Sequence, residues 1–96
     1  MSVDSATGQT GAYGAVTAST TPTEILSANT SRRSVLIQNL SATVDAYVGF
    51  DSSVSGTDGV LIPADGGVYA DDSYAGALYV VTPTDTADVR YQEVSE

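Results

Sequence analysis

Apolar and polar side chains alternate with a period of two residues along most of this chain. Val35 and Ile37 share one face of such a run, whereas Ser34, Leu36 and Gln38 share the other. This period is that of a β-strand with one buried face, and no segment sustains the 3.6-residue period of a helix. The pattern therefore predicts an all-β chain in which each strand has a dry face and a wet face.

The apolar runs are short, and residues that favour turns, chiefly Gly, Pro, Asn and Asp, separate them. The predicted strands lie near Ala15–Thr20, Thr23–Leu26, Ser34–Asn39, Ala46–Phe50, Val60–Ile62, Gly67–Ala70, Ala77–Val81 and Ala87–Gln92. Seven or eight short strands with such turns predict a single antiparallel β-sandwich, with either a jelly-roll or an immunoglobulin-like topology.

The first twenty residues differ from the rest of the chain. They consist almost wholly of Gly, Ala, Ser and Thr, and Tyr13 and Val16 are their only large side chains after Val3. Such a segment contributes little apolar area to a core. We therefore divide the chain into an N-terminal arm, residues 1–20, that is flexible or ordered by a partner, and a β-sandwich domain, residues 21–96. Tyr13 and Val16 become candidate partner-binding residues.

The charge is strongly one-sided. Lysine is absent, and twelve acidic residues face three arginines, so the net charge is −9. In molar salt the Debye length falls to about 3 Å, and dense carboxylates then cost little self-repulsion. This composition favours a protein of a halophile or of a halophile's virus over an ordinary acidic protein. It also argues against nucleic acid as a partner and against anionic membrane surfaces.

Histidine and cysteine are both absent. Their absence removes the commonest general base, the thiolate nucleophile and the commonest transition-metal ligands. We expect no enzyme, no cofactor and no metal. The N-terminus lacks the basic and apolar segments of a secretory signal, and no apolar stretch reaches 18 residues, so we expect the product to stay where it is made.

Two groups of carboxylates are candidates for catalysis or metal binding. Asp71 and Asp72 are adjacent, which predicts a solvated loop rather than the paired, partly buried carboxylates of a glycosidase. The loop 51–59 offers oxygen ligands and glycines for calcium, but it lacks the alternating acidic spacing and the final glutamate of a calcium-binding loop. We assign both groups to solvated loops.

The arginines and tyrosines supply further candidates for a partner surface. Arg32, Arg33 and Arg90 are the only cations, and with twelve acids available we expect intramolecular pairing, the alternative being contacts to an acidic partner. Tyr47 alternates with apolar neighbours, so its side chain points away from the core, and tyrosine is enriched at interfaces. Arg32, Arg33 and Tyr47 therefore join the candidate partner-binding residues.

Several segments together resemble a family of small virion proteins of tailed viruses. The features that carry the resemblance are the Arg32-Arg33 pair, the Leu36–Ser41 strand, the Ala46–Phe50 strand, the Gly59–Ala64 turn and the closing Ala77–Val81 strand. The resemblance spans about residues 23–94, and the Asp65 insertion departs from the family's turn.

The resemblance implies a capsid decoration (cement) protein on the head of a tailed virus, and the charge suggests a haloarchaeal host. It implies the major capsid protein as partner, a homo-oligomer with a trimer favoured, manufacture in the host cytoplasm and a place on the outer capsid surface. The alternative that it implies is a tail- or fibre-associated host-recognition (adhesin) module.

Overall fold

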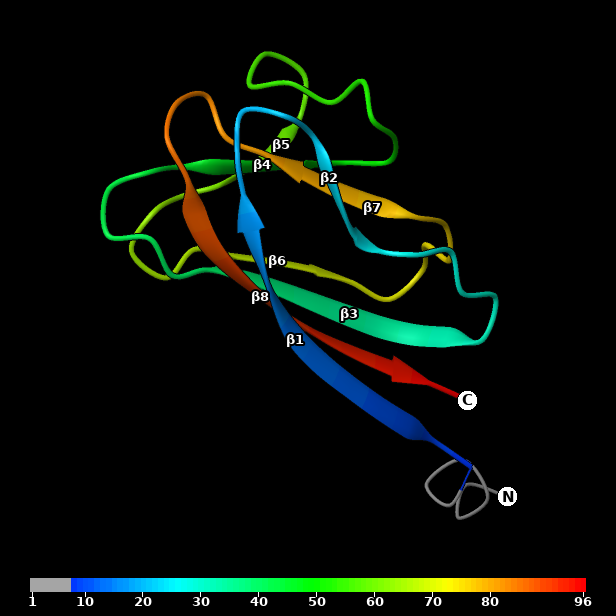
Figure 1. Cartoon of the computed structure of the whole chain (residues 1–96). Helices are drawn as coiled ribbons and strands as arrows, with labels where there is room; N and C mark the ends of the chain where they lie inside the picture. The colour runs from blue at the N-terminus through cyan, green and yellow to red at the C-terminus, as the bar shows by residue number, and fades with distance from the viewer. Residues whose placement is uncertain (1–7) are drawn as a thin grey trace.

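The computed structural model describes residues 8–96, which form eight β-strands and no helix. These residues therefore contain no helix that is long and apolar enough to cross a membrane. The strands are β1 (Thr10–Ala18), β2 (Thr23–Leu26), β3 (Arg32–Asn39), β4 (Ala46–Gly49), β5 (Val60–Ile62), β6 (Val68–Asp71), β7 (Leu78–Val81) and β8 (Ala87–Ser95). They form two four-stranded antiparallel sheets that pack face to face (Figure 1). The predicted all-β sandwich is confirmed.

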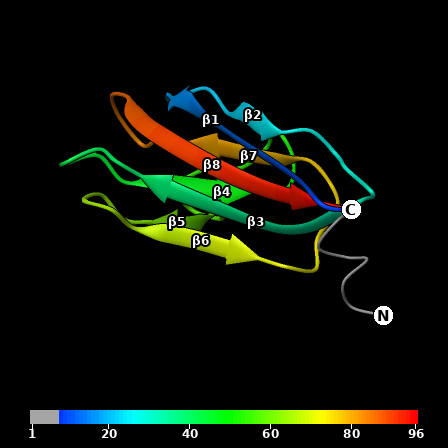
Figure 2. The ribbon, with the colours of Figure 1, turned by 90° about the horizontal axis from the view of Figure 1, so that it is seen from below.

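The strand order decides between the two predicted topologies. One sheet has the order β1-β8-β3-β6 and is called sheet 1 below; the other has the order β2-β7-β4-β5 and is called sheet 2. Every connection except β4–β5 passes from one sheet to the other, which is the jelly-roll arrangement. Figure 2 shows this layering from below, with β8, β3 and β6 in front of β7, β4 and β5.

Small branched side chains form the core between the sheets. The largest fully buried hydrophobic residues are Ile37, Ile62, Leu78, Val80 and Val89. They occupy inward positions of four strands, β3, β5, β7 and β8, because alternate residues of a strand point to the same face. Val35 and Ile37, which the two-residue alternation of the sequence placed on one dry face, are both buried.

Strand β1 lies where the sequence placed a separate arm. Residues 10–18 pair without interruption with β8 of the same chain, from Thr10 opposite Ser95 to Ala18 opposite Ala87. Ala18 is fully buried, whereas residues 10–13 are exposed. The backbone of this segment therefore completes sheet 1 although its side chains add little to the core. Residues 1–7 of the predicted arm lie outside the described residues.

Candidate interaction face

Thirteen side-chain positions of sheet 1 point away from the core and form a single surface, called the outer face below. They alternate with the buried or inward-facing residues of the same strands, and the strand register places them in neighbouring rows. The outer face consists of Gly11, Tyr13, Ala15 and Thr17 on β1, Asp88, Arg90, Gln92 and Val94 on β8, Ser34, Leu36 and Gln38 on β3, and Val68 and Ala70 on β6.

The outer face has no net charge. Its two charged residues, Asp88 and Arg90, form a bidentate pair with Nε–Oδ1 and Nη2–Oδ2 distances of 3.0 and 2.8 Å. The hydrogen bonds from the guanidinium lower the pKa of Asp88, and the same contacts raise the pKa of Arg90. The outer face is therefore neutral in a chain whose net charge is −9.

Most of the remaining acids of the described chain lie away from this surface. Six of them are in loops between strands: Asp45, Asp51, Asp58, Asp65, Asp72 and Asp85. Of these, Asp72 borders the β6 edge of the outer face. Glu24 is exposed on β2 of sheet 2. Because like charges repel, another acidic protein approaches the outer face of sheet 1 at a lower electrostatic cost than it approaches the loops.

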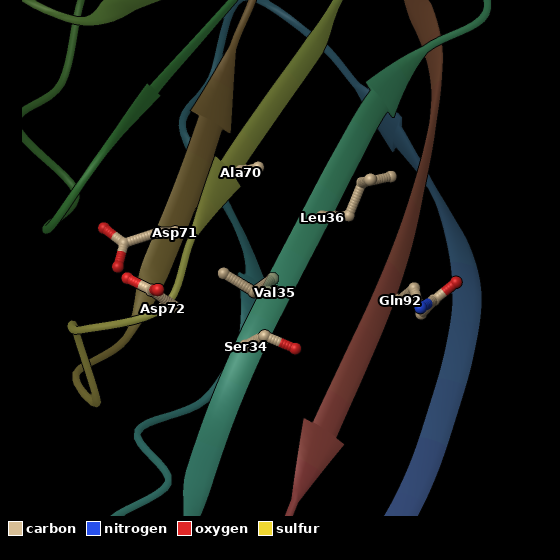
Figure 3. Close-up of a pocket in the computed structure, with 7 residues that line it drawn as sticks. All are labelled: Ser34, Val35, Leu36, Ala70, Asp71, Asp72 and Gln92. Carbon is tan, nitrogen blue, oxygen red and sulfur yellow. The ribbon is translucent and has the colours of Figure 1, made fainter.

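A shallow groove of about 420 Å³ crosses the outer face (Figure 3). It is lined by the outer-face residues Ser34, Leu36, Ala70 and Gln92, by the inward-facing Val35, and by the two carboxylates Asp71 and Asp72 at the end of β6, so the groove is acidic at that end. Leu36 stands opposite Gln92 of β8 on one side and opposite Ala70 of β6 on the other. Its side chain is 39 % exposed, and Val68 on the same face is 49 % exposed. Leu36 thus leaves part of its apolar side chain open to water in the groove.

Tyr13 extends the same row onto β1. It pairs with Gln92 and is 88 % exposed, so this candidate partner-binding residue projects from the outer face of sheet 1. A second hollow of about 290 Å³ lies beside it, lined by Tyr13, Gly14, Ala15, Arg90 and Tyr91. Val16, the other candidate of the predicted arm, points inward and packs against the core, so it does not belong to this surface.

Arg32 is an interior residue and not part of a partner surface. Its side chain is 1 % exposed, and Nε donates to Glu93 Oε2 at 2.8 Å. Its terminal nitrogens donate to the carbonyl oxygens of Tyr74, Gly76 and Ser27 at 3.1, 2.8 and 2.8 Å. Arg32 therefore ties β3 to β8 and to two loops, and its hydrogen-bonding capacity is used within the chain.

Arg33, the neighbouring candidate, is exposed and pairs with Glu96 at 2.7 Å. With Arg90 on Asp88, all three arginines form ion pairs within the chain, so the expected intramolecular pairing is confirmed. The Arg33 side chain is 49 % exposed and lies at the end of sheet 1, beside β8. It remains accessible to a partner only in competition with Glu96.

Tyr47 lies on the opposite side of the molecule. Its side chain points outward from sheet 2, as predicted, but the loop 50–59 folds back over it. A Cβ atom at Gly59 would come within 2.8 Å of the Tyr47 Cβ, and Val54 of the same loop is 7 % exposed. Tyr47 is therefore half-buried by its own chain, and the outer face of sheet 2 is partly covered.

Asp71 is the last residue of a strand and not a loop residue as predicted, and its carboxylate organises the turn that follows. It is the last residue of β6, and its Oδ1 accepts hydrogen bonds from the backbone N–H groups of Ser73 and Tyr74 at 2.6 and 3.0 Å. The Tyr69 hydroxyl donates to Oδ2 at 3.2 Å. These donors, the Ser73 N–H first, lower the pKa of Asp71, while burial and the nearby carboxylate raise the pKa of Tyr69. Asp72 is exposed, as predicted.

The loop 51–59 uses its carboxylates to hold its own backbone. Asp51 Oδ1 accepts hydrogen bonds from the N–H and hydroxyl of Ser53 at 2.9 and 2.6 Å, and these lower the pKa of Asp51. Asp58 Oδ1 accepts likewise from Ser55, at 2.8 and 3.1 Å. Within residues 8–96, no group of three or more acidic side chains converges in a way that would hold a metal ion.

Sequence reasoning overlooked Asn39, a fully buried polar residue at the end of β3. Its amide nitrogen donates to the carbonyl oxygens of Val44 and Ile62 at 2.9 and 3.0 Å, and its Oδ1 accepts from the Ser41 N–H at 2.9 Å. The signal was present, because Asn39 follows Val35 and Ile37 in the inward-facing series. It joins β3 of sheet 1 to β5 of sheet 2.

Comparisons with known proteins bear on the fold. No protein-family model matches the chain, and no curated protein matches it significantly. The structure is similar to a solved chain described in the words "Bacillus endospore appendages form a novel family of disulfide-linked pili", with a TM-score of 0.54 and 12 % sequence identity. The similarity covers 91 % of this chain and 85 % of that chain. At this identity the similarity shows a common fold.

Proposed function

We propose that this chain is a non-catalytic structural protein that attaches to a larger protein assembly through the outer face of sheet 1. The observation that carries the proposal is the neutral, partly apolar outer face on a chain with a net charge of −9. An acidic subunit that must pack against other subunits needs such a surface, because a buried interface excludes uncompensated charge.

The specific role that we propose is that of a capsid decoration protein on the head of a tailed virus, bound to the major capsid protein. The resemblance of residues 23–94 to small virion proteins supports this role, and the lysine-free, acidic composition suits a haloarchaeal virus. Attachment adds buried interface to the shell, which helps the shell to resist the pressure of packed DNA. In molar salt the apolar contacts of the outer face gain strength while charge repulsion is screened.

The fold similarity supports an assembling role in a more general way. The similar chain is described as forming pili, so a sandwich of this kind serves there as a building block. The pili of that description are disulfide-linked, whereas this chain contains no cysteine. Any assembly of this chain therefore depends on non-covalent contacts or on covalent links other than disulfides.

Two leucines provide a matched test of the docking surface. Leu36 on the outer face of sheet 1 is 39 % exposed, and Leu61 on the outer side of sheet 2 is 47 % exposed. Both are exchanged for aspartate, and binding of each variant to virus particles stripped of this protein is measured at equal molar salt. Thermal unfolding of the free variants checks that the fold is retained.

We expect L36D to bind particles at least about tenfold more weakly than the wild type, since it places a charge at the centre of a buried contact. We expect L61D to bind as the wild type does. Wild-type binding by L36D would remove the outer face of sheet 1 from the proposal. Loss of binding by L61D alone would move the docking surface to sheet 2.

A further inference from the structure

We propose that β1 pairs, antiparallel and across a twofold axis, with β1 of a second copy of this chain. The pairing joins the two copies of sheet 1 into one continuous eight-stranded sheet. The inference concerns the free protein in solution, and it stands whether or not the chain decorates a capsid. It rests on the edges of the two sheets.

Within residues 8–96, four strands lie at sheet edges: β1 and β6 in sheet 1, and β2 and β5 in sheet 2. An edge strand offers unpaired backbone donors and acceptors to any other strand, and proteins block such edges with charge, proline, bulges or short length. Comparison of the four edges therefore shows where the chain permits pairing.

Three of the four edges carry such blocks. Strand β2 follows Pro22, contains Glu24 and has an irregular register between Glu24 and Leu26. Strand β6 has four residues and ends in Asp71, and β5 has only three residues. A second strand finds little regular, uncharged backbone to pair with at any of these edges.

Strand β1 carries none of these blocks. It is nine residues long, its register with β8 is regular throughout, and no charged residue occurs between Asp4 and Glu24. In a chain that is otherwise rich in carboxylates, this uncharged edge is the place where two copies can approach without mutual repulsion. Figure 1 shows the first half of β1 projecting with the end of β8 beyond sheet 2, so sheet 2 does not obstruct the approach.

The identity of the partner follows from the same properties. Two copies of one strand that pair antiparallel are related by a twofold axis, so the contact closes on itself and produces a dimer. A pairing of β1 with β6 of another copy would match nine residues against four and would bring Asp71 to the contact. Self-pairing of β1 therefore uses the longest edge and leaves no carboxylate in the contact.

The absence of cysteine makes a disulfide scan a direct test. Single cysteines are introduced as A12C, Y13C, A15C and T17C, all at exposed positions of β1, and each variant is oxidised alone and in pairwise mixtures. Residues directly opposite in an antiparallel pair have Cα atoms about 4.5–5.5 Å apart, which a disulfide spans. A42C, in the exposed loop that follows β3, is the control.

A twofold antiparallel pair makes a distinctive pattern of crosslinks. The residue numbers of every pair of positions that crosslinks rapidly must add up to the same total, because the strands run in opposite directions. We expect that pattern, with A42C remaining monomeric. Crosslinks whose residue numbers differ by a constant would indicate parallel pairing, and crosslinking no faster than for A42C would overturn the proposal.

A second experiment measures the association itself. Tyr13 is 88 % exposed, so its replacement removes few contacts within the monomer. Sedimentation in molar salt compares Y13D, Y13A and the control A42D. We expect Y13D to raise the dissociation constant of the dimer at least about tenfold, because it places two like charges at the contact, and Y13A to change it less. A wild-type protein that stays monomeric at millimolar concentration, or that forms trimers, would contradict the proposal.

Discussion

Replacement of Arg32 by alanine should destabilise the protein far more than replacement of its neighbour Arg33. The Arg32 side chain is 1 % exposed and the Glu93 side chain 14 % exposed, so R32A leaves a largely buried carboxylate without its cation. It also removes the donors to three backbone carbonyl groups. Breaking a buried ion pair in this way costs about 3–5 kcal/mol.

That cost is large for a domain of this size. The expected free energy of unfolding of a 96-residue domain is about 5–14 kcal/mol. A loss of 3 kcal/mol or more lowers the melting temperature by at least about 12 °C, at roughly 4–8 °C per kcal/mol for a small domain. The assay is denaturant unfolding together with calorimetry, both in molar salt.

Arg33 provides the matched control. It also pairs with a glutamate at the end of the chain, Glu96, but both side chains are about half exposed. Exposed pairs contribute about 0–1 kcal/mol, so R33A should unfold close to the wild type. In addition, E93Q should recover part of the stability in the R32A background by removing the unpaired charge. Equal losses for R32A and R33A would refute the assignment of Arg32 to the interior.

Three further outcomes follow from the structure. N39A should lower the free energy of unfolding by about 2–4 kcal/mol, because two carbonyl groups lose their donor and a buried side chain is truncated. Denaturant titration measures this change, and a loss below 1 kcal/mol would contradict the role of Asn39 in joining the two sheets. The pKa of Asp71 is lowered in the folded state, so the ionised Asp71 side chain stabilises the fold above the unfolded-state pKa near 3.9, and this stabilisation is lost as pH falls through the folded-state pKa. The free energy of unfolding of D71N should therefore depend less on pH than that of the wild type below about pH 4. The same pH dependence in both proteins would contradict this role of Asp71. The melting temperature of the wild type should rise steeply from low to molar salt through screening and stronger apolar burial; a flat response would remove the halophilic interpretation.

The alternation of apolar and polar residues predicted most of the strands after residue 22 to within a few residues. Strands β2 and β5 have the predicted bounds, because β-branched and apolar residues there alternate or cluster between clear turns. Strand β1 begins five residues earlier than predicted. Its glycines and alanines have little strand propensity of their own, and the segment is a strand because the edge of β8 is available to pair with it. That information is not local to the sequence.

The candidate site was predicted only in part, for identifiable reasons. Tyr13, predicted to bind a partner from a separate arm, is exposed on the outer face of sheet 1. The register of β3 shifts between Arg32 and Ser34, which turns Arg32 toward Glu93 in the interior, and a bulge of this kind has no signature in the alternation. Tyr47 points outward as predicted, but the loop 50–59, which begins three residues further along the chain, covers it. The absence of net charge on the outer face emerged only from the strand register, which places Asp88 and Arg90 of β8 beside uncharged residues of β1 and β3.

The number of copies per purified virus particle tests the proposed function most directly. Quantitative mass spectrometry against the major capsid protein gives this ratio without any assumption about the docking surface. A decoration protein repeats with the symmetry of the head lattice, so we expect on the order of hundreds of copies per particle. A few copies to a few dozen would place the protein in the tail, and its absence from particles would contradict a structural role in the virion.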